Sequence, residues 1–136
     1  MATDNPQQLH AHSSKKRFHI GDVLSAYSGF LVSKRHMDGV YDTLNFLTGD
    51  NLYTHQLGRA MDECHAWLEK CHPVLKEIDC SGLNPQTLPA WLDGIVAKYG
   101  ETLELQPLPP EGHEFRHPVE ELESMVGKDH IIKVTV

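Results

Sequence analysis

The sequence predicts an α+β protein in which helix dominates, folded as one domain. Its 136 residues are 40% hydrophobic, which suits a single core. Helical periodicity covers most of residues 20–99, and strand-like patterns occur only after residue 100. We therefore expect N-terminal helices followed by a small C-terminal sheet resembling a β-hairpin, with a short helix. The domain would span residues 17–136, after a flexible polar arm at residues 1–16.

The first two predicted helices are defined by their ends as much as by their faces. The stretch GDVLSAYSG, residues 21–29, predicts a short helix with Asp22 near its start and Gly29 as its stop. Gly49 is expected to cap the second helix, because it directly follows an apolar stripe with helical spacing. That stripe consists of Met37, Val40, Tyr41, Leu44 and Leu47.

The longest predicted helix runs over residues 54–72, with Thr54 as its N-cap and Pro73 at its end. Spacings of three and four residues place one apolar stripe along it. The stripe contains Leu57, Met61, Cys64, Leu68, Cys71 and Leu75, so Cys64 and Cys71 are expected in the core.

The C-terminal half begins with a helix over residues 85–99 and then changes character. Residues 101–108 alternate imperfectly and predict a strand, and residues 118–126 predict a short amphipathic helix. Residues 130–136, HIIKVTV, alternate and are rich in β-branched residues, which makes them the strongest predicted strand. We expect this strand to pair with residues 101–108.

The charge is acidic and uneven, which bears on the class of partner. The net charge is −7, of which residues 1–68 contribute −1 and residues 69–136 contribute −6. An acidic surface repels phosphate backbones and suits a basic protein partner, although acidity also serves solubility alone. The sequence contains no run of about 18 apolar residues, so it predicts no membrane span. Three cysteines and no apolar leader favour the reducing cytoplasm.

No pattern of residues predicts catalysis or metal binding. The sequence contains neither a nucleophile elbow nor a glycine-rich phosphate loop. Cys64 and Cys71 would lie roughly 10 Å apart along a helix, too far for two ligands of one ion. His113 and His117 lie in a segment rich in proline and glycine, which predicts a solvated loop. We therefore expect a protein that is not an enzyme, with no metal and no cofactor.

The stretch LNFLTGDNLYTHQLGRA, residues 44–60, joins two predicted helices through a polar turn. One interpretation is a helix-turn-helix whose residues 54–59 read DNA, but Asp50 and Asp62 flank that reader. We favour an exposed joint that meets a protein, with Asp50, Asn51, Tyr53, His55, Gln56 and Arg59 as contacts. A second candidate surface is acidic and consists of Glu111, Glu114, Glu120, Glu121 and Glu123.

Residues 19–75, and above all the motif LNFLTGDNLYTHQL, resemble a family of short uncharacterised proteins encoded by bacteriophages, prophages and plasmids of Proteobacteria. The resemblance implies no catalytic residues. It implies a setting in which small acidic proteins bind a host protein, and inhibitors of bacterial immunity such as anti-CRISPR proteins are a common case.

From this setting we expect a non-enzymatic phage protein that binds and inhibits a bacterial defence complex in the host cytoplasm. A CRISPR effector or a nuclease is the kind of target implied, with no membrane and no direct nucleic-acid binding. Two alternatives stay open. One is a DNA-binding regulator, and the other is a small ligand-sequestering protein or enzyme.

Overall fold

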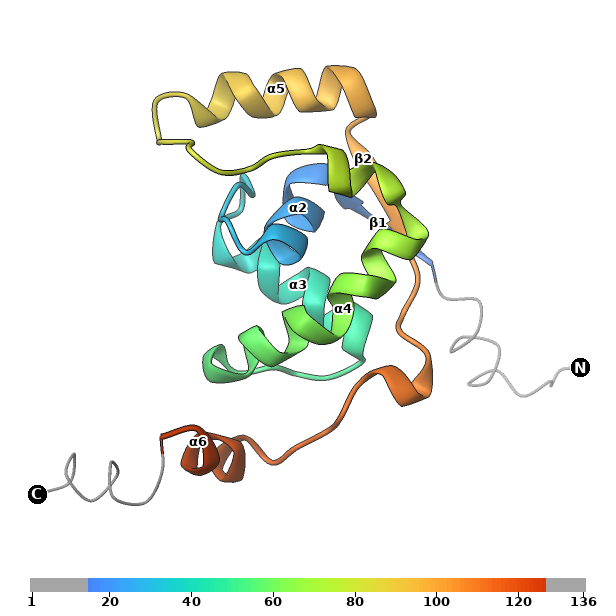
Figure 1. Cartoon of the computed structure of the whole chain (residues 1–136), viewed down its shortest axis with the longest axis vertical. Coiled ribbons are helices and arrows are strands. Elements are labelled where there is room, and N and C mark those ends of the chain that lie inside the picture. The colour runs from blue at the N-terminus through green and yellow to red at the C-terminus, as the bar shows by residue number, and fades with distance from the viewer. Residues whose placement is uncertain (1–14, 127–136) are drawn as a thin grey trace, which may run out of the picture.

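The computed structural model describes residues 15–126 and confirms an α+β protein dominated by helix (Figure 1). Within these residues one small antiparallel sheet accompanies the helices. In chain order the elements are β1 (Lys16–His19), α2 (Ile20–Ser28), α3 (Met37–Thr48), η1 (Thr54–Gln56), α4 (Leu57–Cys71), η2 (Pro73–Glu77), α5 (Leu88–Tyr99), β2 (Thr102–Leu105), η3 (Pro110–Gly112) and α6 (Pro118–Val126), where η marks a 3-10 helix.

The core lies where α2, α3 and α4 pack together (Figure 1). Helix α2 is buried along most of its length, in agreement with its largely apolar sequence. The predicted stripes of α3 and α4 supply the other walls of the core. The largest completely buried side chains include Ile20, Leu24, Leu44, Leu47, Leu68 and Leu75.

The predicted helix stops are confirmed at both glycines. Gly29 and Gly49 have φ angles of 81° and 71°, in the left-handed region that glycine adopts without strain. The start of the long helix differs from the prediction. Residues 54–56 form a 3-10 turn, and Thr54 is not the cap. Instead the Tyr53 N–H donates to Gln56 Oε1 at 2.9 Å, so the glutamine side chain satisfies the free amide.

Strand β2 has a partner that the sequence did not predict, and its expected pairing with residues 130–136 stays a prediction, because those residues lie outside the described part of the chain. This strand pairs antiparallel with β1, in a register that runs from Lys16 opposite Leu105 to His19 opposite Thr102. The pairing buries Phe18 and Leu105 on the core side. Lys16 therefore belongs to the sheet and not to the predicted arm. The remainder of that arm and the predicted strand at residues 130–136 lie outside the described residues.

The cysteine prediction holds for Cys64, which is buried in the core, but not for Cys71, which is exposed. Cys71 is the last residue of α4, and its neighbours in the predicted stripe, Leu68 and Leu75, are fully buried. Cys80 is also buried, and burial raises the pKa of the Cys64 thiol to about 12.

Helices α5 and α6 lie at opposite ends of the molecule, and the chain after β2 runs along one side to connect them (Figure 1). This connection is tied to the core by the Leu108 N–H, which donates to the carbonyl of Leu47 at 2.8 Å. The indole N–H of Trp67 also donates to the carbonyl of Gln106 at 3.0 Å. Among residues 15–126, no helix is long and apolar enough to cross a membrane.

Candidate interaction site

The structure brings the two predicted surfaces together. Residues 113–121 lie across the joint between α3 and α4, so glutamates far along the chain contact the polar groups of that joint. As a result Gln56 retains only 1% of its exposure and Glu121 only 2%. The polar motif that was expected to face a partner is thus largely engaged within the chain.

The centre of this contact is a set of four side chains, called here the Arg59 clasp: Gln56, Arg59, Glu63 and Glu121. Arg59 forms a bidentate ion pair with Glu121, in which Nε donates to Oε2 at 2.6 Å and Nη2 donates to Oε1 at 2.8 Å. Gln56 Nε2 donates to the same carboxylate at 2.9 Å. The other edge of Arg59 reaches Glu63 Oε2 at 2.8 Å and the carbonyl of Glu114 at 2.7 Å.

The electrostatics of the clasp follow from these bonds. The hydrogen bonds from Arg59 are the main cause that lowers the pKa of Glu121 from 4.5 to about 2, against the opposing effect of burial. The pKa of Arg59 is raised above its ordinary value, first by its bonds to Glu121. Glu121 is therefore ionised at any physiological pH, and α6 is anchored by a charged pair.

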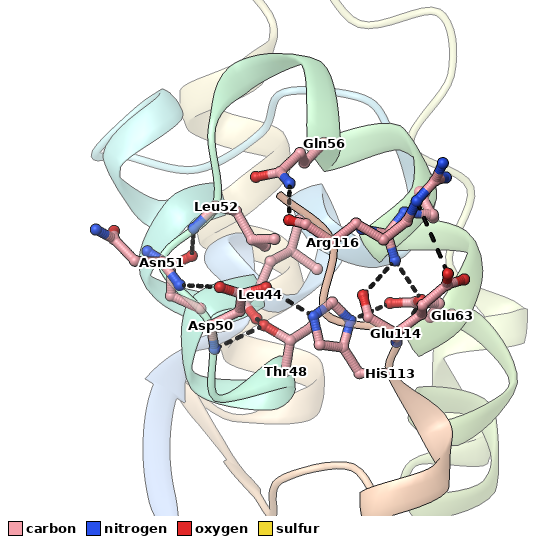
Figure 2. Close-up of polar contacts among 12 residues, drawn as sticks. Leu44, Thr48, Asp50, Asn51, Leu52, Gln56, Glu63, His113, Glu114 and Arg116 are labelled. Atoms are coloured by element: carbon pink, nitrogen blue, oxygen red, sulfur yellow. Dashed lines mark hydrogen bonds and ion pairs between the residues drawn. The ribbon is translucent and has the colours of Figure 1, made fainter. Parts of the chain in front are cut away.

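His113 forms a second tie between the C-terminal segment and the helices. Its ring lies between Asp50 and Glu63, with Nε2 at 2.9 Å from Asp50 Oδ2 and Nδ1 hydrogen-bonded to Glu63 Oε1 (Figure 2). Both ring nitrogens therefore have a carboxylate partner, one from the joint and one from α4. His113 is buried, so the expectation of a solvated loop is wrong at this residue.

The remaining predicted contacts divide between exposed and engaged groups. Asn51 and Tyr53 are exposed, while Asp50 and His55 are partly covered because they hold His113 and the carbonyl of Pro118. Four of the five glutamates are exposed as predicted, namely Glu111, Glu114, Glu120 and Glu123. Glu121 departs from the prediction because Arg59, itself four-fifths buried, requires a carboxylate beside it.

Helix α6 presents apolar side chains to solvent while its glutamate is buried. Val119, Leu122 and Met125 retain 57%, 42% and 60% of their exposure. Their spacing of three residues places them along one side of the helix. Phe115 and Tyr53 are also exposed. We call Val119, Leu122 and Met125, with the neighbouring Tyr53, the α6 face.

The α6 face adjoins a groove of about 410 Å³ between η1 and the start of α6. His55 is fixed at this groove, because its Nε2–H donates to the carbonyl of Pro118 at 2.7 Å. The side chains that line it are Tyr53, His55, His117, Pro118, Val119 and Leu122. The spacing of Val119, Leu122 and Met125 was visible in the sequence, but the pattern could not show which side of the helix would face the core.

The proposed reader of a helix-turn-helix is poorly placed to bind DNA. The N–H groups of the Gln56 and Arg59 side chains donate to Glu121, Glu63 and backbone carbonyls, so these side chains are not free to contact bases. The Thr54 hydroxyl is hydrogen-bonded to the Tyr41 hydroxyl. Within the part of the chain that the structure describes, no three His, Cys, Asp or Glu side chains form a group that could hold a metal ion.

Part of the chain matches a known protein-family model. Residues 18–78 match the family model described as "Domain of unknown function (DUF7736)". The match includes the joint and Arg59 but ends before α5, β2 and α6, so His113, Glu121 and the α6 face lie outside it. No curated protein and no solved structure matches the chain significantly. The match covers slightly less than half of the chain and is consistent with the uncharacterised family that the resemblance implied.

Proposed function

We propose that this is a non-enzymatic protein of a phage or another mobile element that binds a bacterial defence complex in the host cytoplasm and inhibits it. The mode of action would be contact between proteins, made through the α6 face. The resemblance of residues 19–75 to phage, prophage and plasmid proteins supports the setting. The α6 face supports the mode.

The observation that supports contact through the α6 face is the outward orientation of the apolar residues of α6. A short helix normally turns its apolar side to the core, because burying one large apolar side chain stabilises by about 1.5–3 kcal/mol. Here the buried contact is the ionised Glu121, and Leu122 and Met125 are left in water. Neighbouring exposed apolar groups of this kind typically mark an interface, and Tyr53 beside them is a common interface anchor.

The polar cluster supports the non-enzymatic interpretation. Each charged group of the Arg59 clasp, and His113 with its two carboxylates, is paired with another side chain of the cluster. A catalytic base or nucleophile is also hydrogen-bonded to its neighbours, but it must have an atom within reach of the substrate. These residues instead hold the C-terminal segment in place. The exposed glutamates beside them also disfavour direct binding to nucleic acid.

A plaquing assay tests the proposal. The protein is expressed in bacterial strains that carry a single defence system, with isogenic strains lacking that system, and each is challenged with a phage that the system restricts. We expect plaquing to recover in one defended strain. Leu122→Asp should abolish the recovery, because the charge would be buried at the interface. Leu31→Asp is the matched control, since Leu31 is similarly exposed but lies outside the α6 face.

Two outcomes would contradict the proposal. If the wild-type protein restores plaquing in no defended strain, although a full set of CRISPR and restriction systems is tested, inhibition of defence is wrong. If Leu122→Asp inhibits as well as the wild type, the α6 face is not the contact. Purified Leu122→Asp must give the circular dichroism of the wild type, so that a loss of function reports the surface and not the fold.

A further inference from the structure

We infer that the α6 face binds a basic amphipathic helix of the target, which lays its apolar side on Val119, Leu122 and Met125 and directs lysine or arginine towards the surrounding glutamates. This inference rests on the proposed function and names the chemistry of the partner. It is carried by the geometry of the apolar stripe and by the charge around it.

The stripe fits a helix better than an extended peptide. Val119 and Met125 are six residues apart in α6, so the stripe covers about 9 Å of helix rise. Side chains at this spacing form a ridge that packs into the groove of another helix. The groove beside Tyr53 offers about 410 Å³, space for one or two large apolar side chains of the incoming helix. Around α6 the described residues contain no strand edge that an extended peptide could join.

The charge around the stripe selects a basic partner. Glu120 and Glu123 are exposed on α6 itself, and Glu111 and Glu114 are exposed on the segment before it. The only Lys or Arg between residues 106 and 126 is Arg116, which lies 3.8 Å from Glu114 and 4.0 Å from Glu121. Within residues 106–126 the rim is therefore negative after internal pairing, and the complementary charge is basic.

The same charge disfavours the other occupants. A second copy of the chain would place the exposed glutamates of two α6 helices beside one another, at a cost from like-charge repulsion. Anionic lipid and nucleic acid are repelled for the same reason. A basic helix gains both from burial of the stripe and from pairing with the rim.

Fluorescence anisotropy with the intact chain and designed peptides tests the inference. The probe is a labelled peptide of about 18 residues, with leucines on one helical face and lysines elsewhere. One comparison peptide has the same composition in scrambled order, and another has glutamate in place of lysine. We expect the basic amphipathic probe to bind at least about tenfold more tightly than either.

Variants then locate the site. Leu122→Asp should weaken binding of the basic probe about tenfold or more, because it places a charge in the buried stripe. Glu120→Gln with Glu123→Gln should weaken it about threefold to tenfold at low salt, and less at high salt. The matched control is Glu77→Gln with Glu101→Gln, which makes the same change in net charge at exposed positions away from α6. It should leave binding within about twofold.

Each contrary result overturns the inference in a defined way. Equal binding of the scrambled peptide would mean diffuse attraction of charges. Equal binding of the acidic peptide would remove the role of the rim. A wild-type dimer that Leu122→Asp converts to a monomer would assign the face to a second copy. Failure of the basic probe, while Leu122→Asp still abolishes inhibition of defence, would refute the helix but leave the proposed function standing.

Discussion

The ion pair between Arg59 and Glu121 makes a quantitative prediction about the docking of α6. Lowering the pKa of Glu121 from 4.5 to about 2 corresponds to about 3 kcal/mol in favour of the ionised, docked state at neutral pH. Because Arg59 keeps one-fifth of its exposure, solvent screens part of this interaction, and we expect about 2 kcal/mol. Glu121→Gln retains the shape of the side chain and removes its charge.

The sign of the pH dependence is fixed by the direction of the shift. The pKa of Glu121 is lower in the folded state than in the unfolded chain, so the stabilisation is complete above the ordinary value of 4.5. It is lost as the pH falls from about 4.5 towards 2. More than half should have disappeared at about pH 3. The difference in the stability of α6 docking between wild type and Glu121→Gln should therefore shrink as the pH falls.

Hydrogen exchange followed by mass spectrometry measures the free energy of local opening of α6, on a peptide that covers this helix. A loss of 2 kcal/mol accelerates exchange through local opening about 30-fold at neutral pH. Glu120→Gln is the control, because Glu120 is the adjacent residue and is exposed. It should exchange like the wild type. Equal protection of α6 in Glu121→Gln and wild type, or a difference that persists unchanged at pH 3, would refute the argument.

Three further predictions follow from the packing. His113→Ala should destabilise docking of the C-terminal segment by about 1–3 kcal/mol, since it leaves Asp50 and Glu63 without their shared hydrogen-bond partner, whereas Glu111→Ala, at an exposed side chain of the same segment, should change it by less than about 0.5 kcal/mol in the same exchange assay. Gly39→Ala should lower the urea midpoint of unfolding sharply, because the added methyl group would collide with Asp22 and Ser33. Gly58→Ala, in open space on α4, should raise the free energy of unfolding by about 0.5–1 kcal/mol. A Gly39→Ala variant more stable than Gly58→Ala would contradict the packing. Cys71 should be alkylated by iodoacetamide before Cys64 and Cys80, as peptide mapping would show; equal rates would mean that Cys64 and Cys80 are not buried.

The features that the sequence predicted well are those determined by neighbouring residues. The stops at Gly29 and Gly49 and the apolar stripe of α3 depend on contacts within one or two helical turns, so periodicity and turn chemistry reveal them. Proline after α4 ends that helix for the same local reason. The helix-dominant α+β class followed from adding such local signals together.

The features that could not be predicted depend on residues far apart in the chain. Pairing of β2 with β1 joins residues more than eighty positions apart, and a strand pattern does not name its partner. Burial of Glu121 depends on Arg59, 62 residues earlier, and a glutamate near a helix start is otherwise expected in solvent. His113 was misplaced because proline and glycine around it indicate a loop, while its carboxylate partners come from α4 and the joint.

The most direct test of the central claim, that α6 is held by its glutamate and turns its apolar side outward, is the accessibility of the Met125 methyl group. Methionine methyls labelled with ¹³C can be observed by NMR while a soluble gadolinium chelate is added. Met125 and Met37 are exposed and should relax quickly, whereas the partly buried Met61 should be protected. A Met125 methyl as protected as that of Met61 would mean that the α6 face is already covered in the free protein, and would contradict the account.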